Sequence, residues 1–142
     1  MSEYVVCDSP TIKDVGHLKK ALVAIGVKEE NIEMNETPVP LQGYQGDNRS
    51  QKAHIIIRRK HVGSASNDIG FEIRDGGIAI YVSDYDKRRR LGKDVVPMSK
   101  GGTGRLESEY ARSMIEDKMS AQGFKVSQCQ MEGQKIKIRM VR

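Results

Sequence analysis

The stretch DIGFEIRDGGIAIYVS, residues 68–83, contains two runs of strand-forming residues separated by a turn signal. The signal is Asp75-Gly76-Gly77, because Asp-Gly and Gly-Gly pairs adopt the positive φ angles that a tight reversal requires. Apolar residues occupy every second position along the start of the second run, so they share one face of a strand. The stretch therefore predicts a β-hairpin of two strands, residues 68–74 and 78–83.

A helix and two strands are predicted on the N-terminal side of this hairpin. Residues 4–7 and 53–59 are rich in strand-forming residues, and three consecutive isoleucines in the second run indicate burial on both faces. The helix begins at Ser9-Pro10-Thr11, with a hydroxyl cap and a proline in its first turn, and ends at Gly26. Its apolar stripe recurs at helical spacing and comprises Val15, Leu18, Leu22 and Ile25.

Residues 28–50 and residues 87–104 show no periodicity. The first segment contains prolines and glycines that break regular structure, so we expect a long loop in which residues 31–34 form at most a short strand. A loop of this length inside a domain is more often functional than average. The second segment is expected to be a basic, glycine-containing loop.

The C-terminal part predicts a second helix and a second hairpin. An apolar stripe at helical spacing runs through residues 105–121, and Gly123 ends that helix. Residues 124–131 and 135–141 are expected to form two strands joined around Glu132-Gly133. The last strand alternates apolar with basic residues, and its solvent-facing set is Lys135, Lys137 and Arg139.

The order of the predicted elements is β-α-β-β-β-α-β-β. Because so many strands adjoin in sequence, a parallel sheet is excluded, and we expect a single α+β domain over residues 1–142. It contains a mainly antiparallel sheet of five to six strands with two helices on one face. The other face is expected to be exposed or to pair with a second copy, which favours a homo-oligomer.

Composition and charge narrow the class of protein further. The chain has 142 residues, 37% hydrophobic and 30% charged, a balance typical of one folded domain. Its formal net charge of +5 favours phosphate-bearing or otherwise acidic partners. No run approaches the roughly 18 apolar residues of a membrane span, and no secretory signal is recognisable. We therefore expect a cytoplasmic protein without a membrane partner, in which Cys7 and Cys129 are reduced.

Several landmarks together resemble one family. They are Ile12-Lys13-Asp14, Gly43-Tyr44-Gln45-Gly46, Ala53-His54-Ile55-Ile56-Ile57-Arg58, Asp68-Ile69-Gly70-Phe71, Tyr81 with Asp84, Tyr110-Ala111 and Gly123-Phe124-Lys125-Val126. This ordered pattern is similar to the family of unknown function typified by hypothetical chloroplast frame thirty-five, which has cyanobacterial, plastid and phage members. The long basic segment at residues 87–105 and the lack of tryptophan look more like the phage-type members. The resemblance implies no established activity.

The loop Lys100-Gly101-Gly102-Thr103-Gly104-Arg105 directly precedes the second predicted helix. Glycines there let backbone N–H groups approach an anion, and the helix N-terminus adds partial positive charge. In this interpretation Lys100 and Arg105 neutralise a phosphate, while Thr103 donates a hydroxyl hydrogen bond. The alternative is a flexible loop in which Thr103 is a plain helix cap.

Two other segments carry candidate ligand-binding residues. The run Arg88-Arg89-Arg90, close to Tyr85, suits phosphate binding through guanidinium contacts, and its alternative is a solvated basic loop. Tyr44 lies between glycines with Arg49 following, and is either a base-stacking platform or a ring packed against the sheet. Arg58, Arg59 and Lys60 extend from the end of the strand at residues 53–59, and at least one of them is expected to point to the same side as the Tyr44 loop. The alternative is that they only solubilise the strand end.

No catalytic or metal-binding pattern emerges from the sequence. His17, His54 and His61 have no spacing that places two of them on one helix face. Asp84 and Asp86 are a lone acidic pair, which is ordinarily solvated. Because nucleophile-elbow and dinucleotide motifs are also lacking, we expect no catalytic residue, no metal and no cofactor.

The leading hypothesis is a non-enzymatic binding module for a phosphate-bearing ligand of nucleotide size. The ligand would be captured between the Tyr44 loop, the Arg58 strand end and residues 87–105. In a phage-type member, sequestering a host signalling nucleotide would be a natural use of such a module. Two alternatives use the same basic surface: a nucleic-acid-binding accessory protein, and an adaptor or assembly factor whose partner is another protein.

Overall fold

The computed structural model describes residues 3–123, 125–132 and 135–141, and the side chains of residues 3–123. Helices and strands alternate irregularly along the chain. They are β1 (Tyr4–Ser9), α1 (Val15–Ala24), β2 (Glu33–Gln42), β3 (Asn48–Ile57), β4 (Ile69–Arg74), β5 (Gly77–Ser83), α2 (Arg90–Val95), α3 (Arg105–Ala121), β6 (Lys125–Glu132) and β7 (Lys135–Val141).

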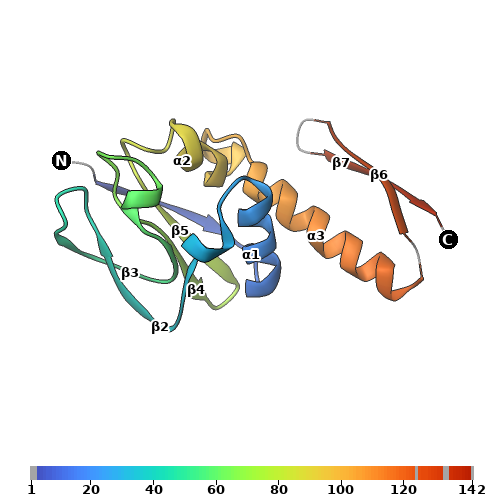
Figure 1. Cartoon of the computed structure of the whole chain (residues 1–142), viewed down its shortest axis with the longest axis horizontal. Coiled ribbons are helices and arrows are strands. Elements are labelled where there is room, and N and C mark those ends of the chain that lie inside the picture. The colour runs from blue at the N-terminus through green and yellow to red at the C-terminus, as the bar shows by residue number, and fades with distance from the viewer. Residues whose placement is uncertain (1–2, 124, 133–134, 142) are drawn as a thin grey trace.

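Five strands form one antiparallel sheet in the order β1-β5-β4-β3-β2. The helices α1 and α3 contribute to one core on the same face of this sheet (Figure 1). The strands β6 and β7 pair with each other in a separate two-stranded sheet beside the outer part of α3. The α+β class, the antiparallel sheet and the two helices on one face are therefore confirmed.

The predicted central hairpin is present as β4 and β5. Arg74 pairs with Gly77, and the turn glycines Gly76 and Gly77 adopt φ angles of 83° and 141°. The pair forms the middle of the sheet, because β3 adjoins β4 and β1 adjoins β5. All of β5 is buried, as expected for a strand with neighbours on both sides and protein on both faces.

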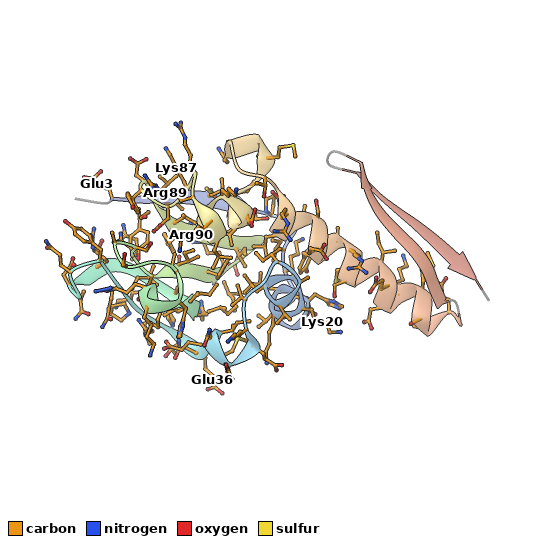
Figure 2. The ribbon with its side chains drawn as sticks, turned by 45° about the horizontal axis from the view of Figure 1, so that its top comes forward. Glu3, Lys20, Glu36, Lys87, Arg89 and Arg90 are labelled. Carbon is orange, nitrogen blue, oxygen red and sulfur yellow. The ribbon has the colours of Figure 1, made fainter. Side chains whose placement is uncertain are left out.

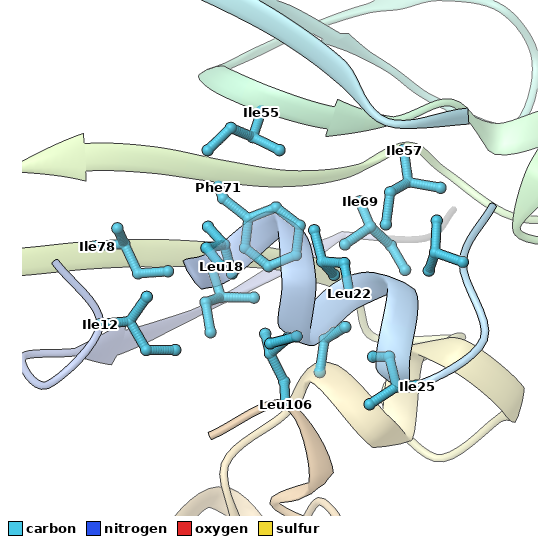
Figure 3. Packing of buried hydrophobic residues seen from close by; sticks show 14 of the residues in the cluster. Ile12, Leu18, Leu22, Ile25, Ile55, Ile57, Ile69, Phe71, Ile78 and Leu106 are labelled. Carbon is cyan, nitrogen blue, oxygen red and sulfur yellow. The ribbon is translucent and has the colours of Figure 1, made fainter. Parts of the chain in front are cut away.

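The larger core lies between the sheet and the two helices. Phe71 of β4 is fully buried in one cluster with Leu18 and Leu22 of α1 and Leu106 of α3 (Figure 3). Burial of a side chain of this size stabilises the fold by about 1.5–3 kcal/mol. The predicted stripe of the first helix is therefore the surface that holds this helix on the sheet.

The start of the first helix differs from the prediction. Ser9 is the last residue of β1, and α1 begins at Val15 with Asp14 as its cap, whose carboxylate accepts the backbone N–H of His17 at 2.9 Å. The hydroxyl of Tyr110 on α3 accepts the N–H groups of Lys13 and Asp14 at 3.0 and 2.9 Å. A partner 96 residues away in sequence thus supports the turn before the helix, which local capping rules do not reveal.

The prediction of a long loop over residues 28–50 is wrong. Most of this segment forms β2 and the first part of β3, a hairpin with ten residues in each strand. Pro38 and Pro40 are tolerated because β2 is the edge of the sheet, and its register shifts between Met34 and Val39 and again after Pro40. An edge strand lacks the second neighbour to which a central residue would donate a hydrogen bond.

Two further segments depart from the expected pattern. The basic segment 87–104 contains the short helix α2 and is therefore not a loop throughout. The C-terminal hairpin does not extend the main sheet, so the sheet has five strands. Phe124, predicted to begin that hairpin, lies outside the described residues, as do the side chains of Lys135, Lys137 and Arg139.

The second face of the sheet is partly covered by the chain itself. Leu41 of β2 and Ala53 of β3 are fully buried there in a small cluster with Tyr81. Gly70 makes this contact possible, because a Cβ at position 70 would lie 2.7 Å from a methyl carbon of Leu41 and 2.8 Å from Cβ of Ala53. This face is therefore not fully exposed.

The carboxylate of Asp68, which is fully buried, joins three segments at one end of the sheet. One oxygen accepts the backbone N–H of Arg59 at 2.7 Å, and the other accepts the backbone N–H of Gln42 at 2.8 Å. The second oxygen also pairs with the guanidinium of Arg58 at 2.8 Å. The ends of β2, β3 and β4 are thereby fixed to one side chain.

Tyr4 ties β1 to the same residue. Its hydroxyl donates a hydrogen bond of 2.6 Å to the carbonyl oxygen of Asp68. Burial, reinforced by the negative charge of Asp68, raises the pKa of Tyr4 far above its ordinary value, so the hydroxyl remains a donor at any physiological pH. Four of the five strands of the main sheet therefore meet at Asp68.

Asp68→Asn is expected to lower the free energy of unfolding by about 3 kcal/mol. The amide would leave Arg58 without its buried counter-charge and would lose one acceptor for a backbone N–H, while the partial exposure of Arg58 keeps the loss near the lower end of the usual range. Urea unfolding followed by far-UV circular dichroism measures this change. Glu36→Gln, an exposed substitution on β2 (Figure 2), is the matched control, and equal stability of the two variants would contradict the role of Asp68.

Candidate functional site

The predicted anion loop at residues 100–105 is closed by a carboxylate of the chain itself. Asp94, at the end of α2 and almost buried, accepts the hydroxyl of Thr103 at 2.9 Å and pairs with the guanidinium of Arg105 at 3.1 Å. The Thr103 hydroxyl and the Arg105 guanidinium therefore already bind a carboxylate of the protein. The negative group at Thr103 and Arg105 thus comes from within the protein.

The backbone of this loop is also turned toward internal partners. The N–H groups of Gly101, Gly102 and Gly104 donate to the carbonyl oxygens of Met98, Pro97 and Val96 at 3.0–3.2 Å. A Cβ on Gly102 would overlap the carbonyl oxygen of Val96, so the glycine serves close packing of the backbone. Lys100 is exposed on the preceding turn.

Tyr44 and Arg49 lie at the far end of the β2–β3 hairpin. The backbone N–H of Tyr44 donates to the side-chain oxygen of Asn67 at 2.9 Å, and the Tyr44 residue is half-buried. Arg49 forms an ion pair of 2.9 Å with Asp47, and its guanidinium lies 6.0 Å from the ring centre of Tyr4. Both residues are anchored to the body of the protein.

Arg58 is held by two carboxylates. Besides Asp68, it binds Glu33 with two parallel hydrogen bonds of 2.9 and 2.7 Å. Partial burial opposes ionisation of Glu33, but the hydrogen bonds donated by Arg58 and Asn35 outweigh it and lower the pKa of Glu33. The guanidinium of Arg58 is therefore engaged on both sides within the fold.

Arg89 and Arg90 have a different environment, because they line an open hollow of about 290 Å³. The guanidinium carbon of Arg89 lies 4.3 Å from the ring centre of Tyr85, which places the cation over the ring. Tyr85 is 41% exposed, so much of the stacked pair faces solvent. We call this site the Tyr85 hollow, and its lining is Val62, Gly63, Ser64, Ala65, Ser66, Tyr85, Asp86, Arg89 and Arg90.

The floor of the Tyr85 hollow is an ordered polar network. Asp86 is 3% exposed, and its two carboxylate oxygens accept the hydroxyls of Ser66 and Ser83, each at 2.7 Å. The backbone N–H of Asp86 donates in turn to the hydroxyl oxygen of Ser83 at 3.0 Å. Asp86 is fixed in position, yet a carboxylate has about four lone-pair sites, so further acceptor capacity remains.

A second hollow of about 350 Å³ adjoins the first. Val62 and Arg90 belong to the linings of both, so the two spaces meet at these residues. We call this site the His61 hollow, and its lining is Ile25, Gly26, Val27, Lys28, Asn31, His61, Val62, Arg90, Leu91 and Asp94.

Arg90 has an unusual backbone conformation. Its φ is 39°, which makes it the sole non-glycine residue with positive φ in the described part of the chain. This conformation is uncommon and strained for a residue with a long side chain. The Arg90 side chain is exposed and forms no ion pair with a described residue, whereas nearby Lys87 pairs with Asp84 at 2.8 Å. Lys87, Arg89 and Arg90 lie close together at the surface next to α2 (Figure 2).

The predicted site residues are thus divided among several places. Arg89 lines the Tyr85 hollow, and Arg90 lines both hollows. Arg88, which precedes them in sequence, is exposed. The expectation that Asp86 is solvated is wrong, because Asp86 is 3% exposed, and sequence reasoning missed the wall formed by residues 62–66. A usable signal was the run of small residues Gly63-Ser64-Ala65-Ser66, a few positions after the basic residues 58–60, since small side chains leave space beside a cation.

Two features of the described residues bear on whether the protein has a reactive nucleophile or a group of metal-ligating side chains. Cys7 is almost fully buried, and burial raises the pKa of its thiol, so the reactive thiolate is disfavoured. Among residues with described side chains, no group of three or more His, Cys, Asp or Glu is arranged to hold a metal ion. Within the same part of the chain, every helix is too short or too polar to cross a membrane.

These features define a small α+β protein with a basic surface site made of two adjoining hollows. Residues 26–141 match the model of the family described as "Protein of unknown function (DUF1257)", and the chain belongs to that family. The matched segment contains the lining of both hollows except Ile25. Neither the curated proteins nor the solved structures gave a match.

Asp94→Ala is expected to destabilise the fold by about 1–2 kcal/mol, because the Thr103 hydroxyl and the Arg105 guanidinium lose their acceptor. The vacated position should then accept an external anion. Thermal unfolding with and without inorganic phosphate measures both effects, and phosphate should raise the Tm of Asp94→Ala more than that of the wild type. Glu30→Ala, an exposed acidic position, is the control, and an equal phosphate response in all three proteins would contradict this assignment.

Proposed function

We propose that this protein is a non-enzymatic binding module for a phosphate-bearing ligand of nucleotide size, held at the Tyr85 hollow. The observation that carries the proposal is the exposed stack of Arg89 on Tyr85, with a distance of 4.3 Å from the guanidinium carbon to the ring centre, next to the exposed guanidinium of Arg90. A stacked ring and a free guanidinium side by side suit a ligand that has both a flat ring and an anionic group.

The physical chemistry of the two groups supports this assignment. Stacking of a base on an aromatic or guanidinium plane contributes about 1–3 kcal/mol and tolerates any base, because each base has a π-face. Guanidinium groups bind phosphate oxygens through paired, charge-assisted hydrogen bonds. An exposed, pre-formed stack therefore offers affinity without new ordering of the side chains.

The polar floor suggests how the ligand is oriented. The negative charge of Asp86 repels a phosphate from the bottom of the hollow, while Arg89 and Arg90 attract it to the rim. The remaining acceptor capacity of Asp86 suits the hydroxyl or N–H donors of a sugar or a base. The nucleoside part would thus enter first, and the phosphate would remain at the rim.

The family resemblance bears on the biological use. We propose that the chain is a cytoplasmic, phage-type member of the family typified by hypothetical chloroplast frame thirty-five. The long basic segment around Arg88-Arg89-Arg90 supports this reading, since it distinguishes the chain from plastid members. Sequestration of a host signalling nucleotide would use binding alone, without chemistry, and a homo-oligomer would multiply the sites.

One alternative has support of its own. The net charge of +5 and the exposed cations Arg88, Lys93 and Lys100 favour a nucleic-acid-binding accessory protein. Such a protein would bind strands of many lengths, with an affinity that falls steeply as salt increases. An adaptor whose partner is another protein would respond to neither class of ligand.

Native mass spectrometry of the protein purified from cells is expected to detect a retained small ligand. Tyr85→Ala and Arg89→Ala should each weaken its retention about tenfold or more, because each removes one half of the stack. Lys20→Ala, an exposed cation on α1 far from the labelled arginines (Figure 2), should retain the ligand fully. Undiminished retention in both stack variants would exclude this site, and binding of long single strands with a steep salt dependence would favour the alternative.

A further inference from the structure

We infer that the ligand consists of two ring-bearing moieties joined through a phosphate, as in a dinucleotide, with one moiety in each hollow and the phosphate at Arg90. This inference rests on the proposed function, because it assigns the chemical class of the ligand at the same site. It uses three observations that the proposed function does not need: the size of the hollows, their junction, and the backbone of Arg90.

The two volumes together suit a ligand that is larger than one nucleotide. The Tyr85 hollow and the His61 hollow measure about 290 and 350 Å³. Sites that enclose most of a small ligand usually span roughly 300–1,000 Å³, so each hollow alone is at the lower limit. A mononucleotide in the Tyr85 hollow would leave the adjoining space to solvent, whereas a ligand of two moieties fills both.

The junction of the hollows is where a linking phosphate would be expected. Val62 and Arg90 are shared by both linings, so these two residues lie at the boundary between the two spaces. A phosphodiester between two nucleosides carries one negative charge, which matches the single guanidinium at the boundary. Arg89 lines the Tyr85 hollow on one side of this boundary. The basic residues Lys28 and His61 line the His61 hollow on the other side.

The His61 hollow has the chemistry of a second ring site. Ile25, Val27 and Leu91 supply an apolar wall, while Asn31 supplies an amide that both donates and accepts hydrogen bonds. Asp94 also contributes to the lining, and its oxygens bind Thr103 and Arg105. An apolar wall with one polar edge is the common composition of a site for a flat heterocycle.

The backbone of Arg90 points to a role for its side chain. The segment before α2 is tightly folded, because the N–H of Arg89 donates to the carbonyl oxygen of Asp86 at 2.9 Å and a Cβ on Gly92 would overlap the same carbonyl. Glycine would adopt the φ of 39° at position 90 without strain. Strained positions of this kind cluster where a side chain must be held for binding. Arginine at this position places a cation at the junction.

Isothermal titration calorimetry with two matched sets of probes tests the inference. The first set is the four ribonucleoside 5′-monophosphates, and the second is the sixteen ribodinucleoside monophosphates with one internal phosphate. At least one dinucleoside monophosphate should bind the wild-type protein at least tenfold more tightly than either of its component mononucleotides. Comparable affinity for the two sets would overturn this inference and leave the proposed function intact, whereas binding of neither set would overturn both.

Three variants locate the effect. Arg90→Gly should abolish the preference for the dinucleoside probe while its Tm stays equal to or above that of the wild type, since the positive φ is relieved. His61→Ala should lower the affinity for the dinucleoside probe and leave the affinity for mononucleotides unchanged, because it alters the His61 hollow alone. Lys93→Gly removes an exposed cation from the same helix and should keep the preference. Preference retained in Arg90→Gly, or lost equally in Lys93→Gly, would overturn the assignment of the phosphate to Arg90.

Discussion

The buried carboxylate of Asp68 is the constraint on which both the sheet and the site depend. It binds the backbone N–H of Arg59 at 2.7 Å, so the two ends of the connection between β3 and β4 are fastened to each other. That connection includes residues 61–66, which form one wall of the two hollows. A single buried anion therefore closes the sheet at one end and fixes the loop that shapes the surface above it.

The fold was predictable where the signal is local. The β4–β5 hairpin follows from Asp75-Gly76-Gly77, and both long helices follow from apolar stripes that end at glycines. β2 was not predictable in this way, because prolines argue against a strand until its place at the edge of the sheet is known. The start of α1 was also missed, since Tyr110, distant in sequence, supports the preceding turn.

The positive charge of the site was predictable from the sequence, but the ion pairs that its basic residues form within the fold were not. Basic residues at 49, 58, 89, 90 and 105 look alike in sequence, yet Asp47, Glu33, Asp68 and Asp94 neutralise three of them within the fold. Which cations stay free depends on tertiary contacts. The register of the β4–β5 hairpin is one signal that could have located the hollow. Because Gly70 lies opposite Tyr81, the residues before β4 lie near those after β5. In the structure, the hydroxyl of Ser66 binds Asp86 at 2.7 Å.

The prolines of β2 also make this edge of the sheet a poor template for another strand. An exposed strand edge presents unpaired N–H and C=O groups that can template the addition of another chain. At Pro38 and Pro40 there is no N–H to offer, and the shifts in register bend the strand out of a straight ladder. Growth of the main sheet by addition of a strand at β2 is therefore disfavoured.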